Sequence, residues 1–199
     1  MHSKKIKEVY SKLAKGYNDE VLKKAKYVAH KKIGMLISNK VINKFAKILD
    51  LGCGTGLSSL EFFKRGYEVT GIDIAPGMIS QAKKLPYEKL ICQDLEVPLR
   101  VNNNYYDAVV LTGVMEFIKK PLKIFQQVNK KLVKNGICGV TIPKKQSKLE
   151  IQSYYKKEIE PVFRKAGFII VEAKSIFGYY KKGDINLRVN YYGYVLRKK

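Results

Sequence analysis

Short apolar runs alternate with segments of helical spacing along most of this 199-residue chain. The apolar runs predict strands near residues 47–51, 68–73, 89–93, 106–111, 137–142, 168–177 and 187–197. Between them, the spacing of apolar residues predicts helices over residues 57–65, 76–84, 121–134 and 150–166. This alternation favours an α/β fold with a doubly wound, mostly parallel sheet. The last two strands have no helix between them and should form an antiparallel hairpin.

The part of the chain before the first strand has a different pattern. Residues 4–15 and 19–45 mix apolar and lysine positions in the way that surface helices do. We interpret residues 1–45 as a helical cap on a core formed by residues 46–199, and the whole of 1–199 as a single domain. A chain of 199 residues with 46% hydrophobic content is long enough to bury a substantial core.

The most informative motif is a glycine-rich loop at the end of the first predicted strand. Residues 48–56 read Ile-Leu-Asp-Leu-Gly-Cys-Gly-Thr-Gly. Glycine has no Cβ, so such a loop lets the backbone approach a ligand closely. The spacing is G-x-G-x-G, whereas a dinucleotide fingerprint needs G-x-G-x-x-G and a triphosphate loop needs Gly-Lys followed by Ser or Thr. The chain therefore has neither phosphate-binding motif, and we expect an adenosine ligand without phosphates.

Acidic residues lie at or near the ends of the first three predicted strands. They are Asp50, Asp73 and Asp94. Open α/β sheets bind ligands at the carboxyl ends of their strands, and a carboxylate there can accept hydrogen bonds from two neighbouring hydroxyls. A single glycine turn or a single acid after a strand is more often only a turn or a helix cap. Three such elements in series favour a cofactor site.

Together these segments resemble the motifs of the class I S-adenosylmethionine-dependent methyltransferases, in which an acid precedes a G-x-G-x-G loop. The resemblance extends through Ala75–Ile79 and Tyr106–Leu111 and covers roughly residues 10–199. It implies a Rossmann-like, seven-stranded, mostly parallel sheet, and S-adenosylmethionine as cofactor with S-adenosylhomocysteine as product. In that family the acid after the second strand binds the ribose hydroxyls and the acid after the third faces the adenine amine. Here those acids are Asp73 and Asp94.

The resemblance also implies a set of residues that contact the cofactor. We expect this set to be Tyr17, Asp50, Gly52, Cys53, Gly54, Gly56, Asp73, Ile74, Met78, Asp94, Leu95 and Thr112. The segment from Val9 to Asn18 resembles the family's opening pattern, in which two aromatics, here Tyr10 and Tyr17, close over the cofactor. Such a lid would exclude water from the sulfonium and place a π face near its charge. Tyr10 could equally serve only to pack the cap onto the sheet.

The loop after the fourth strand is the expected substrate side of the site. In many small-molecule members of the family, histidines flank a Leu-Glu pair here, whereas this chain has Gly113 and Phe117 at those positions. The catalytic residue is therefore left open, with Glu116 and Tyr17 as candidates for proton handling. Glu116 could instead be a charge at a helix start. Methyl transfer from a sulfonium is an in-line displacement, for which positioning and desolvation can supply most of the rate.

Composition narrows the expected partners and metals. The formal net charge is +22, but only five of the 39 basic residues are arginines, which recognise nucleic acid better than lysines do. We interpret the charge mainly as a solvated surface and do not expect specific nucleic-acid binding. Three cysteines without metal-ligand spacing and two histidines predict no metal site. No apolar run spans a membrane and the N-terminus does not read as a signal peptide, so we expect a cytoplasmic enzyme.

The function that these features favour is methyl transfer from S-adenosylmethionine to a small-molecule acceptor. The expected enzyme is similar to the ubiquinone and menaquinone methyltransferases. One alternative is a methyltransferase of RNA or protein, which the charge permits although no Asn-Pro-Pro-Tyr or Asp-Pro-Pro-Tyr follows the fourth strand. The other is a cofactor-binding interaction module without turnover. The acceptor and the oligomeric state are left open.

Overall fold

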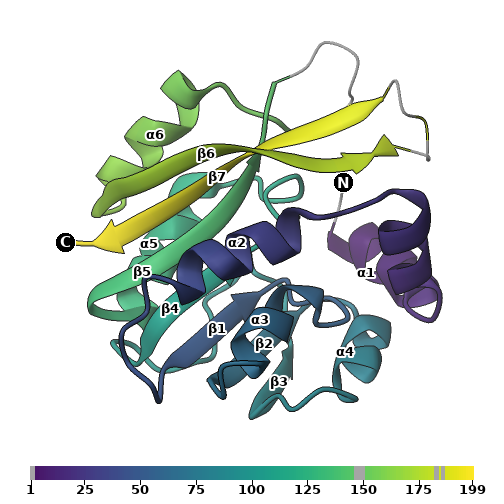
Figure 1. Cartoon of the computed structure of the whole chain (residues 1–199), viewed down its shortest axis with the longest axis horizontal. Helices are drawn as coiled ribbons and strands as arrows, with labels where there is room; N and C mark the ends of the chain where they lie inside the picture. Colours follow the sequence, from purple (N-terminus) through teal and green to yellow (C-terminus); the bar gives the residue numbers. More distant parts are fainter. Residues whose placement is uncertain (1–2, 146–150, 182–183, 185–186) are drawn as a thin grey trace.

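One seven-stranded sheet forms the centre of the computed structural model, which describes residues 3–145, 151–181, 184 and 187–199 (Figure 1). The strand order is β3-β2-β1-β4-β5-β7-β6. The strands are β1 (Lys47–Leu51), β2 (Glu68–Asp73), β3 (Lys89–Cys92), β4 (Tyr106–Leu111), β5 (Leu132–Pro143), β6 (Phe168–Tyr180) and β7 (Arg188–Lys198). β7 pairs antiparallel with β5 and β6, and the other neighbours are parallel. The predicted Rossmann-like class with an antiparallel C-terminal hairpin is confirmed.

Helices cover both faces of the sheet. They are α1 (Ser3–Leu13), the π-helix η1 (Asp19–Lys24), α2 (Ala29–Ser38), the 3₁₀ turn η2 (Leu57–Ser59), α3 (Leu60–Phe63), α4 (Pro76–Ala82), α5 (Pro121–Lys131) and α6 (Lys156–Lys165). On the near face in Figure 1, α2 and α3 bury Ile33 and Phe62 against the strands. On the other face, α5 and α6 bury Phe125 and Phe163. The central strands are apolar because both of their faces are covered. No helix among the described residues is long and apolar enough to cross a membrane.

The N-terminal cap is fastened to the C-terminal hairpin. The Val28 N–H donates to the carbonyl of Gly178 at 3.2 Å, and the Tyr180 N–H donates to the carbonyl of Ala25 at 2.8 Å. The segment between η1 and α2 therefore lies along β6. This pairing explains why the helix expected over residues 19–45 is interrupted: Lys26 adopts a left-handed conformation with φ of 54°, and regular helix resumes only at α2.

Three other predicted helices differ most from the structure. The helix expected to reach residue 134 ends at Lys131, because Leu132 is extended, fully buried and paired with Tyr106. The helix expected from residue 150 begins at Lys156, after a bridge between Tyr154 and Lys144, and residues 146–150 lie outside the described part. The helix expected over residues 57–65 is reduced to η2 and the single turn α3. The expected hairpin turn partly lies outside the described residues.

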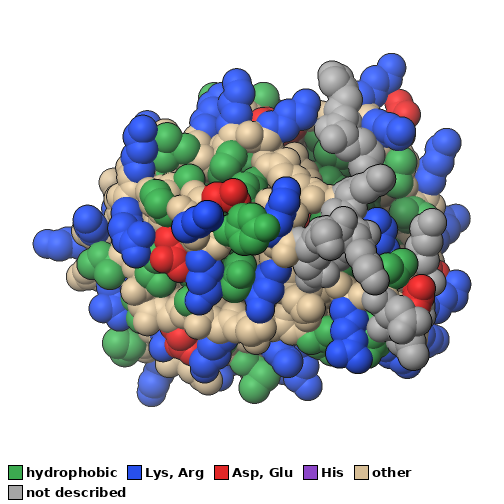
Figure 2. Space-filling view, turned by 90° about the horizontal axis from the view of Figure 1, so that it is seen from above, with side chains coloured by type: hydrophobic (Ala, Val, Ile, Leu, Met, Phe, Trp, Pro, Cys, Tyr) green, Lys and Arg blue, Asp and Glu red, His purple; other side chains and the backbone are tan. Residues whose placement is uncertain are grey.

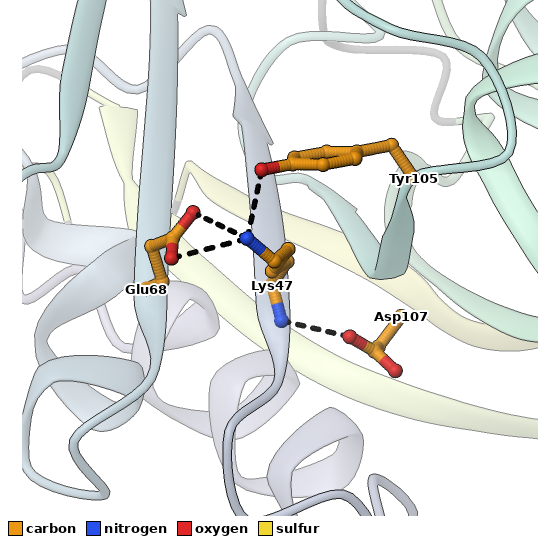
Figure 3. Close-up of polar contacts among 4 residues, drawn as sticks. All are labelled: Lys47, Glu68, Tyr105 and Asp107. Atoms are coloured by element: carbon orange, nitrogen blue, oxygen red, sulfur yellow. Dashed lines mark hydrogen bonds and ion pairs between the residues drawn. The ribbon is translucent and has the colours of Figure 1, made fainter.

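A polar network joins β1, β2 and β4 at their amino ends (Figure 3). The Lys47 ammonium contacts both carboxylate oxygens of Glu68, at 3.1 and 3.2 Å, and donates to the Tyr105 hydroxyl at 2.7 Å. The backbone N–H of Lys47 donates to Asp107 at 2.8 Å, and the Asn43 amide donates to the same carboxylate at 3.2 Å. This network fixes the edge of the sheet that lies opposite the carboxyl ends of the strands.

Candidate functional site

A cavity of about 1010 Å³ lies at the carboxyl ends of β1, β2 and β4, against the N-terminal cap. Its walls come from cap residues between 3 and 30, the glycine loop, Asp73, Ile74 and Met78, residues 94–96, 112–114, 116–118 and 151–152, and parts of β6 and β7. The sheet order reverses at this point, because β1 lies between β2 and β4. The connections that follow β1 and β4 cross opposite faces of the sheet, which leaves a crevice between them.

Two glycines of the loop after β1 serve different purposes. Gly52 has φ of +74°, and a Cβ there would lie 2.3 Å from Cγ2 of Val114, so packing against the β4 loop requires glycine. Gly54 has φ of +53°, and a Cβ there would meet no atom of the protein within 4 Å. Gly54 lines the cavity. Its open face is therefore available for close approach of a ligand to the backbone.

Asp73 is held at the end of β2 by the backbone of two neighbouring segments. Its Oδ2 accepts a 2.8 Å hydrogen bond from the Gly54 N–H, and its Oδ1 accepts a 2.8 Å hydrogen bond from the Ala75 N–H. Burial raises the pKa of Asp73, and these N–H donors oppose the rise. The side chain lines the cavity, and each oxygen keeps a lone pair for a further donor.

Asp50 and Gly56, two predicted cofactor contacts, are not among the residues that line the cavity. Asp50 lies behind the loop, where its Oδ2 accepts hydrogen bonds from the Ser58 and Ser59 hydroxyls at 2.6 and 2.7 Å. Burial raises the pKa of Asp50 to about 6. At Gly56, which has φ of +98°, a Cβ would lie 2.4 Å from Cδ1 of Leu85. Both residues therefore support the glycine loop through contacts outside the cavity lining.

The other predicted cofactor contacts do line this cavity. They are Tyr17, Gly52, Cys53, Gly54, Asp73, Ile74, Met78, Asp94, Leu95 and Thr112. Asp94 is oriented by the Glu96 N–H, which donates to its Oδ1 at 2.9 Å. The Thr112 hydroxyl is buried without a hydrogen-bond partner among the described residues. Residues from four strand ends and the cap are therefore brought to one space.

The two aromatics expected to form a lid meet at the cavity. Tyr10 and Tyr17 pack edge to face with ring centroids 6.1 Å apart, and Tyr10 also contacts Phe117 with centroids 5.6 Å apart. The cap is tied to the glycine loop next to them, because the Thr55 hydroxyl donates to the Asn18 side-chain oxygen at 2.6 Å. Burial, together with the charges of nearby carboxylates, raises the pKa of Tyr17 to about 12. Tyr17 is therefore a protonated hydrogen-bond donor near neutral pH.

Glu116 lies deep in the same cavity, on the loop after β4. Its Oε1 accepts a short hydrogen bond from the Tyr191 hydroxyl of β7. Its Oε2 is buried and has no hydrogen-bond partner among the described residues. Burial raises the pKa of Glu116, and the Tyr191 hydrogen bond opposes the rise. Glu116 thus lines the cavity, and one of its carboxylate oxygens has no hydrogen-bond partner among the described residues.

Sequence reasoning missed Tyr27 and His30 of the cap, which also line the cavity. The Tyr27 hydroxyl and His30 Nδ1 are buried without partners among the described residues. The Tyr27 hydroxyl lies 3.1 Å from the point where a Cβ would stand on Gly113. The sequence did contain one signal for Tyr27. Gly113 lies on the loop after the fourth strand, and a glycine there leaves room for a side chain from another segment.

The described residues contain no group of three or more His, Cys, Asp or Glu side chains that could hold a metal ion. Cys53 and Cys138 are buried free thiols and Cys92 is an exposed one. Burial raises the pKa of Cys53 in the glycine loop well above its ordinary value, so its sulfur stays protonated.

Comparison with known proteins gives matches around the glycine loop. Residues 49–140 match the family model described as a methyltransferase domain. The mouse thiol S-methyltransferase TMT1B is 30% identical over 97 residues, which are 45% of this chain and 39% of that protein. The ubiquinone biosynthesis O-methyltransferase of Coxiella burnetii is 28% identical over 95 residues, which are 45% of this chain and 40% of that protein. The chain thus covers about two fifths of the length of these relatives.

Solved structures resemble the chain over most of its length. The 1,6-didemethyltoxoflavin-N1-methyltransferase of Burkholderia thailandensis, solved with 1,6-didemethyltoxoflavin and S-adenosylhomocysteine, has a TM-score of 0.72 and 14% identity over 96% of this chain and 87% of its own. TehB from Haemophilus influenzae has a TM-score of 0.70 and 22% identity over 91% of this chain and 66% of its own. At these identities the likeness concerns the fold.

Proposed function

We propose that this protein, whose residues 49–140 match the family model of a methyltransferase domain, binds S-adenosylmethionine and transfers its methyl group to a small-molecule acceptor. The observation that carries the proposal is the hydrogen bond from the Gly54 N–H to Asp73. It fixes a carboxylate that faces the cavity beside a stretch of backbone that is open to a ligand. A glycine loop that only turned the chain, or an acid that only capped a helix, would need neither the fixed carboxylate nor the open backbone.

The residues around the cavity fit this cofactor. Beyond its two backbone donors, Asp73 has lone pairs suited to the ribose hydroxyls, and Asp94 could accept from the adenine amine. Ile74, Met78 and Leu95 supply apolar surface for a planar base. When bound, the cofactor supplies an electrophilic methyl group on a sulfonium.

The protein's own contribution is positioning, exclusion of water and proton handling. Tyr10 and Tyr17 cover the cavity from the cap, and the Tyr17 hydroxyl stays protonated because its pKa is raised to about 12. Tyr17 can therefore donate a hydrogen bond but is not suited to act as a base near neutral pH. Glu116 has the unsatisfied oxygen and is the better candidate for holding a proton.

The charge distribution supports a small acceptor. Figure 2 shows Lys and Arg side chains scattered among hydrophobic and acidic ones over the face that it draws. Among the described residues that line the cavity, Lys12 is the single lysine or arginine. Nucleic acid is bound through clustered phosphate contacts. The proposal therefore does not include specific nucleic-acid binding.

We also propose a division of the chain into a cap and a core. Residues 1–45 would act as a cap on a core formed by residues 46–199, with both belonging to one domain. Two backbone hydrogen bonds, from Val28 to Gly178 and from Tyr180 to Ala25, fasten the cap to β6 and support this division. A cytoplasmic location remains a prediction.

Two measurements test the proposal. Calorimetric titration should show binding of S-adenosylmethionine and S-adenosylhomocysteine, and either ligand should raise the melting temperature. A cell extract, separated into metabolite and RNA fractions, should then be incubated with the protein and methyl-labelled cofactor at physiological ionic strength. We expect label in the metabolite fraction.

Other outcomes would contradict specific parts of the proposal. No binding to the folded protein at millimolar cofactor would refute the cofactor assignment. Label at a defined RNA position, with none in metabolites, would replace the small acceptor by RNA. Binding without transfer to any fraction would favour a non-catalytic module.

A further inference from the structure

The cavity reverses the charge balance of the protein. The chain has 39 lysines and arginines against 17 acidic residues. The described lining residues include one lysine, Lys12, and five carboxylates, of which Glu20 already pairs with Lys24 at 2.7 Å; the others are Asp73, Asp94, Glu96 and Glu116. His30 adds no charge near neutral pH, because burial lowers its pKa to about 4. The lining therefore disfavours an anionic occupant and favours a neutral or cationic one.

Glu116 is the carboxylate among these whose charge is least satisfied. A second tyrosine–glutamate pair shows the contrast: the Tyr194 hydroxyl donates to Glu160 at 3.0 Å, and Glu160 also pairs with Arg164 at 3.5 Å. Glu116 has its Tyr191 hydrogen bond, but it takes part in no salt bridge among the described residues, and its Oε2 is orphaned. A buried carboxylate without a cation is costly. A cationic ligand would remove that cost.

Tyrosine side chains from the cap and from two strands line the cavity together with this carboxylate. They are Tyr10 and Tyr17 of the cap, Tyr27 before α2, Tyr179 of β6 and Tyr191 of β7. Tyr27 and Tyr179 have ring centroids 6.2 Å apart, and Tyr179 and Tyr191 have centroids 6.4 Å apart. All five side chains line the same cavity as Glu116, and the Tyr191 hydroxyl donates a hydrogen bond to its carboxylate. Aromatic faces around a carboxylate are suited to bind an ammonium ion.

We propose that the acceptor is a small amine, which binds as its ammonium ion to Glu116 inside this group of tyrosines. The inference rests on the proposed methyl transfer and specifies its substrate class. Tyr27 and Thr112 also line the cavity, and their buried hydroxyls, which have no hydrogen-bond partner among the described residues, are further acceptors for N–H groups. A carboxylate or phosphate substrate would meet Glu116 and Asp73 without a compensating cation.

The chemistry balances with the groups present. The bound ammonium loses one proton to the Glu116 carboxylate, which leaves a neutral amine with a free lone pair. That lone pair forms the new N–C bond while the S–C bond breaks and its electron pair stays on sulfur. The products are S-adenosylhomocysteine and a methylated ammonium ion, and the proton on Glu116 passes to solvent when the product leaves.

The first experiment separates amine recognition from recognition of the cofactor's own sulfonium. S-adenosylmethionine carries a positive sulfur and S-adenosylhomocysteine does not, so a carboxylate that faces the sulfur should discriminate between them. Glu116→Gln keeps an oxygen that can accept from Tyr191. We expect this variant to bind both ligands within about twofold of the wild type. A selective loss of S-adenosylmethionine affinity would assign Glu116 to the sulfonium and overturn the amine proposal.

The second experiment uses probes that share a phenyl ring and a short chain but differ in the terminal polar group. They are 2-phenylethylamine, 2-phenylethanol, 2-phenylethanethiol and 3-phenylpropanoate, titrated into the complex with S-adenosylhomocysteine. We expect the amine to bind at least about tenfold more tightly than the alcohol, thiol or carboxylate. Glu116→Gln should reduce that preference to about threefold or less. The matched control is Glu160→Gln, which removes the carboxylate of the paired tyrosine–glutamate contact outside the cavity and should leave the preference unchanged.

The outcomes distinguish this inference from the proposed function. If the folded wild type does not bind S-adenosylhomocysteine, the proposed function itself fails. If it binds that ligand but prefers the alcohol or thiol, or none of the probes, the amine assignment fails while the cofactor assignment stands. Should Glu116→Gln not fold, the order of the four probes on the wild type still decides the substrate class. Methylation of the amine, detected as S-adenosylhomocysteine release from S-adenosylmethionine, is the expected functional result.

Discussion

The Gly54 N–H donates a 2.8 Å hydrogen bond to Asp73, and this bond joins the loop after β1 to the end of β2. The second carboxylate oxygen accepts from Ala75 at 2.8 Å. Considered from the sequence alone, Asp73→Asn should be milder than Asp73→Ala. The structure predicts that both are harmful, because an asparagine would turn its NH₂ group toward one of the two N–H donors.

We therefore expect Asp73→Asn and Asp73→Ala each to weaken cofactor binding by about 1.5–3 kcal/mol. Calorimetric titration of the folded variants with S-adenosylhomocysteine measures this loss. Wild-type affinity in both variants would show that Asp73 only orders the loop.

Gly52 and Gly54 form a matched pair for separating folding from binding. Alanine at either position costs about 1 kcal/mol for its positive φ. Gly54→Ala adds a methyl group in open space, so its stability should fall little further while cofactor affinity falls at least about tenfold. Gly52→Ala must displace Val114, whose Cγ2 lies 2.3 Å from the new Cβ, and should be the less stable variant by roughly 1–3 kcal/mol. Urea unfolding and titration together check both effects, and equal stability of the two variants would contradict the packing argument.

Asp50 should make the protein's stability depend on pH. Burial raises its pKa to about 6 in the folded protein, against about 3.9 in an unfolded chain. The folded state therefore binds the proton more tightly, and this carboxyl's contribution to the free energy of unfolding increases as pH falls from about 7 toward 4. Relative to Asp50→Asn, the wild type should gain on the order of 1–2 kcal/mol between about pH 7 and pH 5. A gain in the opposite direction would mean that the Ser58 and Ser59 hydrogen bonds keep the carboxylate charged.

Asp107 should affect stability without affecting binding. It accepts from the Lys47 backbone N–H at 2.8 Å (Figure 3). It also accepts from the Asn43 amide at 3.2 Å, at the end of the sheet opposite the cavity. Asp107→Ala leaves the part-buried N–H of Lys47 without its acceptor and should lower the free energy of unfolding by about 1–2 kcal/mol. Cofactor affinity should stay within about twofold of the wild type. A large change in affinity would show that the amino-end network is coupled to the site.

The central strands and the glycine loop were predictable because their signals are local. β1, β2 and β4 have the residue bounds that their apolar runs predict, since strands covered on both faces must be apolar throughout. The glycines at 52 and 54 adopt positive φ, which their residue type already favours. The position of Asp73 at the site was predictable as well, because Asp73 is the last residue of the parallel strand β2.

The elements that were predicted wrongly depend on contacts between distant parts of the chain. The helical pattern over residues 19–45 does not reveal that the backbone at Ala25 and Val28 pairs with β6, more than 140 residues further along the chain. Leu132 leaves the helix for the same kind of reason, because extended backbone there pairs with Tyr106. In both cases tertiary hydrogen bonds outweigh a local preference of a few tenths of a kcal/mol per residue.

The sequence by itself determined the half of the cavity in which we propose that the cofactor binds, because its acid, glycines and strand ends are encoded in short, contiguous motifs. Only the tertiary structure decided the other half. From the sequence, Glu116 could be either a charge at a helix start or a substrate contact. The structure favours the substrate contact, because Glu116 is buried, accepts a hydrogen bond from Tyr191 and has one oxygen without a partner among the described residues. Tyr27 reaches the same space from the cap beside Gly113. Burial and pairing depend on every segment that closes around a side chain, and no local pattern records them.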